Sequence, residues 1–123
     1  MNSTTKNYLA IFLGNPNKSM MDAFNALPEA ERMKRMKEGG DAWHAWVEKH
    51  KGSIVEMGSP LGKTKRTSKS GVEDTRNNMG AWTVVRAGSH DEAAKMFENH
   101  PHFTIFPGEC VEIMECLPIP PKM

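Results

Sequence analysis

The sequence of 123 residues has only two cysteines, no long apolar run and almost no net charge, and each shortage excludes a class of protein. No uncharged stretch approaches the roughly 20 residues that a transmembrane helix needs. The apolar run from Tyr8 to Leu13 is too short for a signal peptide, so we expect a cytoplasmic protein without a membrane partner. A formal net charge of +1 argues against a nucleic-acid partner, because such binding depends on neutralising phosphates.

The positions of the two cysteines argue against a disulfide, and several common catalytic motifs are missing. Cys110 and Cys116 lie on one predicted strand, and an extended strand of that length separates them by about 20 Å, too far for a disulfide. We therefore expect two reduced thiols. The sequence also lacks a Gly-x-Ser-x-Gly elbow, a P-loop and a cysteine nucleophile with a partner. We predict no cofactor.

The length fits a single domain, which we place at residues 1–123, with a core at about 7–117 and a proline-rich tail at 118–123. Apolar alternation, prolines, glycines and two apparent capping boxes, at Ser19–Asp22 and Ser89–Glu92, divide the chain into elements. These elements are, in order, a strand at 7–13, helices at 19–27, 28–38 and 41–51, strands at 53–57 and 81–87, a helix at 89–100 and a strand at 110–116. A polar segment at 58–79 shows no helical period, and loops of that length are usually functional or disordered.

This order of elements predicts the fold class. Two crossovers around a central pair of strands form the split βαβ arrangement, and handedness and connection rules leave few other topologies. We therefore expect an α+β, ferredoxin-like βαββαβ fold with an antiparallel sheet.

The strands are apolar on both faces, which indicates a second copy. The first strand carries Tyr8, Ala10 and Phe12 on one face and Leu9, Ile11 and Leu13 on the other. One layer of helices covers only one face of a sheet, and a face in water should be polar. We therefore expect a homodimer in which two sheets cover each other. The alternative is that the proline-rich tail folds over the open face.

Two histidine pairs are candidates for acid–base chemistry or ligand binding. His100 and His102 lie two residues apart, so in an extended segment both imidazoles would meet one ligand or metal; no third ligand stands at a recognised metal spacing, and we predict no metal site. His44 follows Asp41 by three residues, and a histidine oriented by a carboxylate is a minimal general base. The plainer alternatives are a packed core histidine at His100 and an ordinary surface pair at His44.

Aromatic and basic residues predict a ligand cleft. Trp43, Trp82 and Phe103 would line it, and a segment rich in basic and hydroxyl residues, with Lys63, Lys65 and Arg66, could hold a carboxylate or phosphate at its mouth. The alternative is a solvated segment without a ligand.

Four short motifs follow one another along the chain: Gly58-Ser-Pro-Leu61, Met79-Gly-Ala-Trp-Thr-Val-Val85, Ser89-His-Asp-Glu-Ala93 and Val111-Glu-Ile113. In this order and spacing they resemble the YCII-related (DGPF-type) domain family. The resemblance implies the dimeric α/β-barrel form of the ferredoxin-like fold, with a cleft between sheet and helices. Some relatives carry a His–Asp pair suspected of acid–base work, and the family's helix histidine falls near His44. The Asp-Gly-Pro-Phe motif itself is missing, and the corresponding region reads Glu73-Asp-Thr-Arg-Asn-Asn78.

Two functions are consistent with these features. The first is a small-molecule binding protein that holds an acidic or aromatic ligand in a cleft of a homodimer. The second is a cofactor-free enzyme of the lyase, isomerase or dehalogenase type that uses a histidine as general base.

Overall fold

The computed structural model describes residues 5–121 and has the predicted ferredoxin-like fold. A four-stranded antiparallel sheet has the order β2-β5-β1-β6, which is the strand order of the split βαβ arrangement. The elements are β1 (Lys6–Gly14), α1 (Lys18–Asn25), α2 (Glu29–His50), β2 (Ile54–Glu56), β3 (Thr64–Ser68), β4 (Gly71–Thr75), β5 (Met79–Ala87), α3 (His90–Lys95), α4 (Pro101–Thr104) and β6 (Gly108–Glu115). None of the helices within residues 5–121 is long and apolar enough to cross a membrane.

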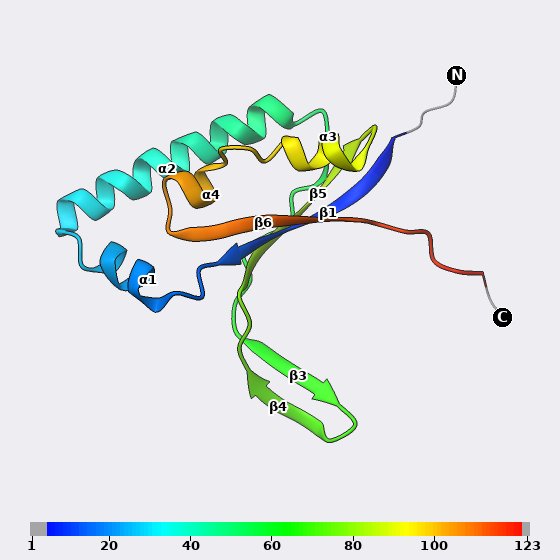
Figure 1. Ribbon diagram of the computed structural model, residues 1–123, viewed down its shortest axis with the longest axis horizontal. Helices are drawn as coiled ribbons and strands as arrows, with labels where there is room; N and C mark the ends of the chain where they lie inside the picture. The colour runs from blue at the N-terminus through cyan, green and yellow to red at the C-terminus, as the bar shows by residue number, and fades with distance from the viewer. Residues whose placement is uncertain (1–4, 122–123) are drawn as a thin grey trace.

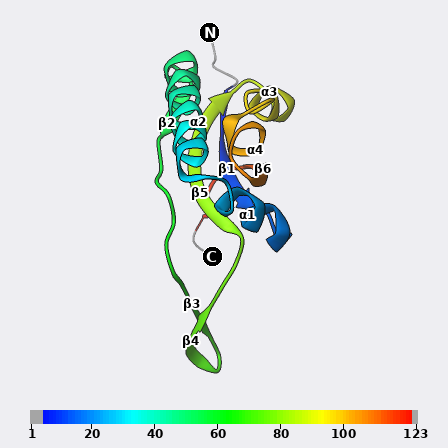
Figure 2. The same cartoon turned by 90° about the vertical axis from the view of Figure 1, so that its left-hand side faces the viewer.

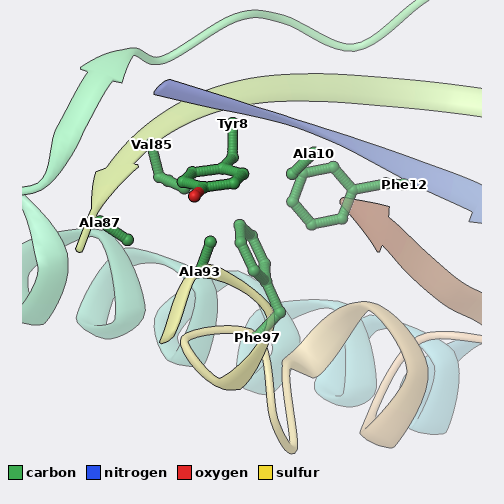
Figure 3. Packing of buried hydrophobic residues seen from close by; sticks show 7 residues of the cluster. All are labelled: Tyr8, Ala10, Phe12, Val85, Ala87, Ala93 and Phe97. Atoms are coloured by element: carbon green, nitrogen blue, oxygen red, sulfur yellow. The ribbon is translucent and has the colours of Figure 1, made fainter. Parts of the chain in front are cut away.

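The core lies between the sheet and a layer of helices that covers one of its faces (Figure 1). Alternate residues of β1 are buried there, and the register pairs Tyr8 with Val85 and Ala10 with Thr83. Phe97 and Ala93 close the core from the helical side, as Figure 3 shows. The period of two in β1 thus decides which side chains the helices cover.

The Ser89 capping box is confirmed at the start of α3. The Ser89 hydroxyl accepts from the amide of Glu92 at 3.1 Å, and the Glu92 carboxylate accepts from the amide of Gly88 at 2.9 Å. The predicted box at Ser19 is wrong, because Asn17 is the N-cap of α1 and its side chain accepts from the amide of Ser19 at 3.0 Å. Asparagine ranks with serine as an N-cap, so local sequence did not separate the two.

The predicted break at Gly39-Gly40 is also wrong, since α2 runs unbroken from Glu29 to His50. Gly39 is buried, and a Cβ at this position would lie 2.4 Å from the ring of Phe106. The glycine therefore permits close packing against the chain after α4 and does not end the helix. Pro101 likewise begins α4 and does not merely end the preceding helix, because a proline is tolerated in the first turn.

The polar segment at 58–79 contains a hairpin that sequence reasoning did not predict. Strands β3 and β4 pair antiparallel from Thr64 with Thr75 to Ser68 with Gly71, and Gly71 has the positive φ of +107° that the tight turn requires. We call residues 62–77 the arm. The arm extends away from the sheet on the side opposite the helices, in both views (Figures 1 and 2).

The second face of the sheet, which we call the open face, carries no helix (Figure 1). Register places Leu9 beside Val84 and Met114, and Ile11 beside Trp82 and Glu112. Met114 is 41% exposed, and the other apolar side chains of this face are half-buried, namely Leu9, Ile11, Trp82 and Val84. Residues 116–121 do not cover this face, because they run away from the body and leave Ile119 91% exposed. The tail alternative is therefore not what the structure shows.

Candidate functional site

A largely apolar cleft of about 430 Å³ lies between α2 and one end of the sheet. Its volume falls within the usual range for small-molecule sites, and its walls are mainly aromatic and aliphatic. The residues that line it are Phe12, Trp43, Trp46, Val47, Met57, Gly58, Ser59, Pro60, Gly80, Ala81, Trp82, Thr83 and His102.

Helix α2 supplies two indoles to the cleft because Trp43 and Trp46 lie three residues apart, on the face that meets the sheet. The ring of Trp43 packs on Phe12 with centroids 5.0 Å apart. The Nε1 of Trp46 donates to the carbonyl of Met96 at 2.7 Å, which fixes the indole against the chain after α3. Both indoles are thus held in place without any ligand.

One wall of the cleft is the segment from Met57 to Pro60, which runs beside β5. Gly58 has φ +71°, and a Cβ there would meet the carbonyl oxygen of Trp82, so only glycine permits this approach. The buried Thr83 hydroxyl donates to the carbonyl of Met57 and ties the segment to the sheet. This wall of the cleft is therefore backbone that is held against β5.

His102 brings the imidazole to this apolar cleft. Its Nε2 lies 2.7 Å from the carbonyl oxygen of Leu13, and a carbonyl can only accept, so Nε2 carries the proton in the neutral ring. The Nδ1 nitrogen is then the acceptor of that ring. The ring also lies close to Gly108, where a Cβ would be 2.3 Å from Nε2. The structure thus fixes both the position and the tautomer of His102.

His100 lies behind His102 and is fully buried, at 0% exposure. Its Nδ1 accepts from the amide of His102 at 3.0 Å, and its ring packs edge-on against Trp43 with centroids 4.5 Å apart. Within residues 5–121 its Nε2 has no hydrogen-bond partner. Burial, then the charges of His102 and His50, lowers the pKa of His100 to about 4. His100 is therefore a neutral ring in the aromatic core, which supports His102 from behind.

The structure does not bring the predicted His44–Asp41 pair to the cleft. His44 is exposed on α2, and the carboxylate of Asp41 accepts from Lys37 at 2.9 Å. This hydrogen bond also raises the pKa of Lys37. Phe103 lies elsewhere, in a groove with Phe24 of α1. Of the residues predicted from the sequence, Trp43, Trp82 and His102 line one cleft and His100 supports it.

The predicted basic residues do not rim this cleft. Lys63 and Lys65 line a separate hollow of about 840 Å³ at the base of the arm, where most of the lining residues are polar or charged. Lys65 pairs across the hairpin with Asp74 at 2.6 Å, and Arg66 pairs with Glu73 at 3.8 Å. No group of three His, Cys, Asp or Glu side chains in the described chain is placed to hold a metal ion.

Sequence reasoning missed most of the wall, including Trp46, Phe12 and Pro60. Trp46 is three residues after Trp43 on the apolar stripe of α2, and this spacing could have included it. Phe12 could have been placed by the alternation of β1. Pro60 gives no such signal, because its position depends on the backbone conformation at Gly58.

No protein-family model and no curated protein matches this sequence. Among solved structures, the chain is similar to 5-chloro-2-hydroxyhydroquinone dehydrochlorinase (TftG) from Burkholderia phenoliruptrix AC1100 in complex with 2,5-dihydroxybenzoquinone. The two share 19% identity over 87% of this chain and 89% of that chain, with a TM-score of 0.49. It is also similar to a dimeric protein of unknown function and ferredoxin-like fold from Bacteroides fragilis NCTC 9343, at 11% identity over 94% of this chain and 98% of that chain, with a TM-score of 0.37. At this level of similarity, neither structure assigns an activity to this chain. Membership of the YCII-related family stays a prediction from the four motifs.

Proposed function

We propose that this protein binds a small aromatic molecule in the cleft between α2 and the sheet, and that it does so as a homodimer. One observation carries the proposal: two indoles of α2, those of Trp43 and Trp46, line the same largely apolar hollow. A flat ring would stack or pack edge-on against the indoles, and such contacts add about 0.5–1.5 kcal/mol each beyond the area they bury. His102 is the ionisable side chain of that lining, and it would orient a polar substituent on the ring.

The exposed area supports the homodimer. The chain exposes 9154 Å², whereas a compact monomer of 13.8 kDa would expose about 6600 Å². The arm and residues 116–121 extend from the body and are largely exposed, so they contribute to this excess. A standard dimer interface buries about 800 Å² on each partner, which the excess can supply.

A thermal-shift panel tests the cleft. Phenol, catechol, hydroquinone and benzoate are compared with cyclohexanol, a ring of similar size that cannot stack. A ligand that binds only the folded protein raises the melting temperature. We expect at least one aromatic compound to raise it and cyclohexanol to have little effect.

Two variants locate the binding. Ala81 is half-buried in the cleft, so A81L adds a larger side chain to the hollow and should abolish the shift. Ala45 is exposed on α2, so A45L is the matched control and should keep the shift. Equal shifts in both variants would place the ligand outside the cleft.

A second function, a cofactor-free enzyme of lyase, isomerase or dehalogenase type, is favoured by one observation. The hydrogen bond to Leu13 leaves the Nδ1 of His102 as a nitrogen able to take a proton from a ligand in the cleft. H102Q keeps a donor for the Leu13 carbonyl but has no basic nitrogen. Conversion of the panel compounds and their chlorinated forms is followed by mass spectrometry. If His102 is the base, H102Q should still bind but lose about 10²–10⁴-fold in rate. If it keeps the full rate, the histidine has no such role.

A further inference from the structure

We infer that the arm of one copy docks on strand β6 of a second copy, through opposite charges on the two elements. This inference rests on the proposed homodimer. It adds the segment that holds the two copies in register, which an apolar face alone does not specify.

The position of the arm supports this docking. The arm extends past the sheet on the side away from the helices, which is the side of the open face (Figures 1 and 2). A second copy seated on the open face would therefore lie beside the arm. Strand β6 is at the edge of the sheet, so one of its sides is unpaired and accessible to that copy.

The arm also has little to hold it in place within its own chain. All residues from Lys65 to Asp74 are exposed, so neither face of the hairpin packs on the body. An isolated two-stranded hairpin is at best marginally stable in water. Its only large apolar side chain is Val72, at 67% exposure, so an apolar contact is not what the arm offers.

Charge identifies the strand that the arm fits. Residues 62–77 contain five basic and two acidic side chains, a net charge of +3. Strand β6 contains three acidic and no basic side chains, a net charge of −3. Two oppositely charged elements on one chain fit a symmetric pair, in which each copy gives its arm and receives the other.

Most of the charged side chains that would meet across the two copies have no ion-pair partner within residues 5–121. Residues 5–121 show no ion-pair partner for Lys63, Lys69 or Arg76 of the arm, whereas Lys65 and Arg66 pair across the hairpin. On β6, Glu115 pairs with Lys6 at 3.3 Å, but Glu109 and Glu112 have no cation beside them in that range. Together with burial, these two carboxylates raise the pKa of the Cys110 thiol, which is consistent with a negative potential at β6.

Charge reversal on each element gives a test with an internal rescue. An arm-reversed chain carries K63E, K69E and R76E, and a strand-reversed chain carries E109K and E112K. The control chain carries K34E and K49E on α2, away from both elements. Dissociation constants are measured by sedimentation at 50 mM and 500 mM NaCl, and thermal melting checks that each chain folds.

We expect the wild type to form a dimer whose dissociation constant rises with the salt concentration. Each reversed chain on its own should have a dissociation constant at least about tenfold higher than the wild type, and the control chain should match the wild type. An equimolar mixture of the two reversed chains should form a heterodimer of near wild-type affinity, because both arms then meet strands of opposite charge.

Two results would overturn the inference, and they are distinguishable. If the wild type is a dimer but arm reversal leaves its dissociation constant unchanged, the arm is not the contact while the homodimer stands. If the wild type is a monomer at tens of micromolar, both the arm contact and the proposed homodimer are refuted, and only the cleft remains to be judged by the ligand panel.

Discussion

The buried imidazole of His100 makes a quantitative prediction about stability and pH. Its pKa is lowered from 6.5 to about 4 by burial, with smaller contributions from His102 and His50. The unfolded chain therefore binds this proton near pH 6.5, whereas the folded chain binds it only near pH 4. Between these values the unfolded state holds more protons, so the free energy of unfolding falls as the pH is lowered.

The size of the effect follows from the shift. Each pKa unit corresponds to about 1.4 kcal/mol, so the free energy of unfolding should fall by about 3 kcal/mol between pH 7.5 and pH 4 through this group. The loss should be small above pH 6.5 and level off below about pH 4. A protonated His100 would also lose the Nδ1 acceptor that now receives the amide of His102.

The variant H100N isolates this contribution. Asparagine can still accept from the His102 amide as an N-cap, but it does not titrate. Its smaller side chain should lower stability at every pH, because it leaves space beside Trp43 and Trp46. The comparison therefore rests on how steeply the free energy of unfolding changes with pH, measured by urea denaturation at a fixed protein concentration. H44N, which removes an exposed histidine, controls for the loss of one histidine as such.

We expect the wild type to lose about 3 kcal/mol more than H100N between pH 7.5 and pH 4. If the two proteins lose stability in parallel over this range, His100 is not a buried neutral histidine and the description of the cluster behind His102 is wrong.

Two further predictions concern packing and assembly. G39A should destabilise the protein by about 1–3 kcal/mol in urea denaturation, because the new methyl group meets the ring of Phe106. G40A should stabilise the protein by about 0.5–1 kcal/mol, because a methyl group at that position enters open space. Equal effects of the two substitutions would contradict the close packing at Gly39. I11D on the open face should raise the dimer dissociation constant at least about 100-fold, because it would bury an unpaired charge, whereas I119D in the exposed tail should not. A dimer that survives I11D in sedimentation would place the interface elsewhere.

The sheet was predictable from the sequence because strands with a buried face repeat every two residues. β1 and β5 lie close to their expected bounds, and the Ser89 box marks the start of α3 correctly. The arm was not predictable in this way, since its strands are polar on both faces and carry no alternation. Only the turn at Ser70-Gly71 offered a local signal.

The break predicted in α2 shows a second limit. Gly39 reads as a helix terminator by propensity, but its role is to admit the ring of Phe106, which approaches from far along the chain. Such a tertiary contact leaves no local mark. The same holds at the site: His102 and Phe103 are neighbours in sequence, yet the single turn of α4 directs one to the cleft and the other to the groove beside α1.

The most direct test of the account is a crystal structure of the protein with the aromatic compound that gives the largest thermal shift. The account predicts that the ring lies between Trp43 and Pro60, with a polar substituent directed to Nδ1 of His102. A compound bound in the hollow at the base of the arm, or in the groove beside Phe103, would contradict it.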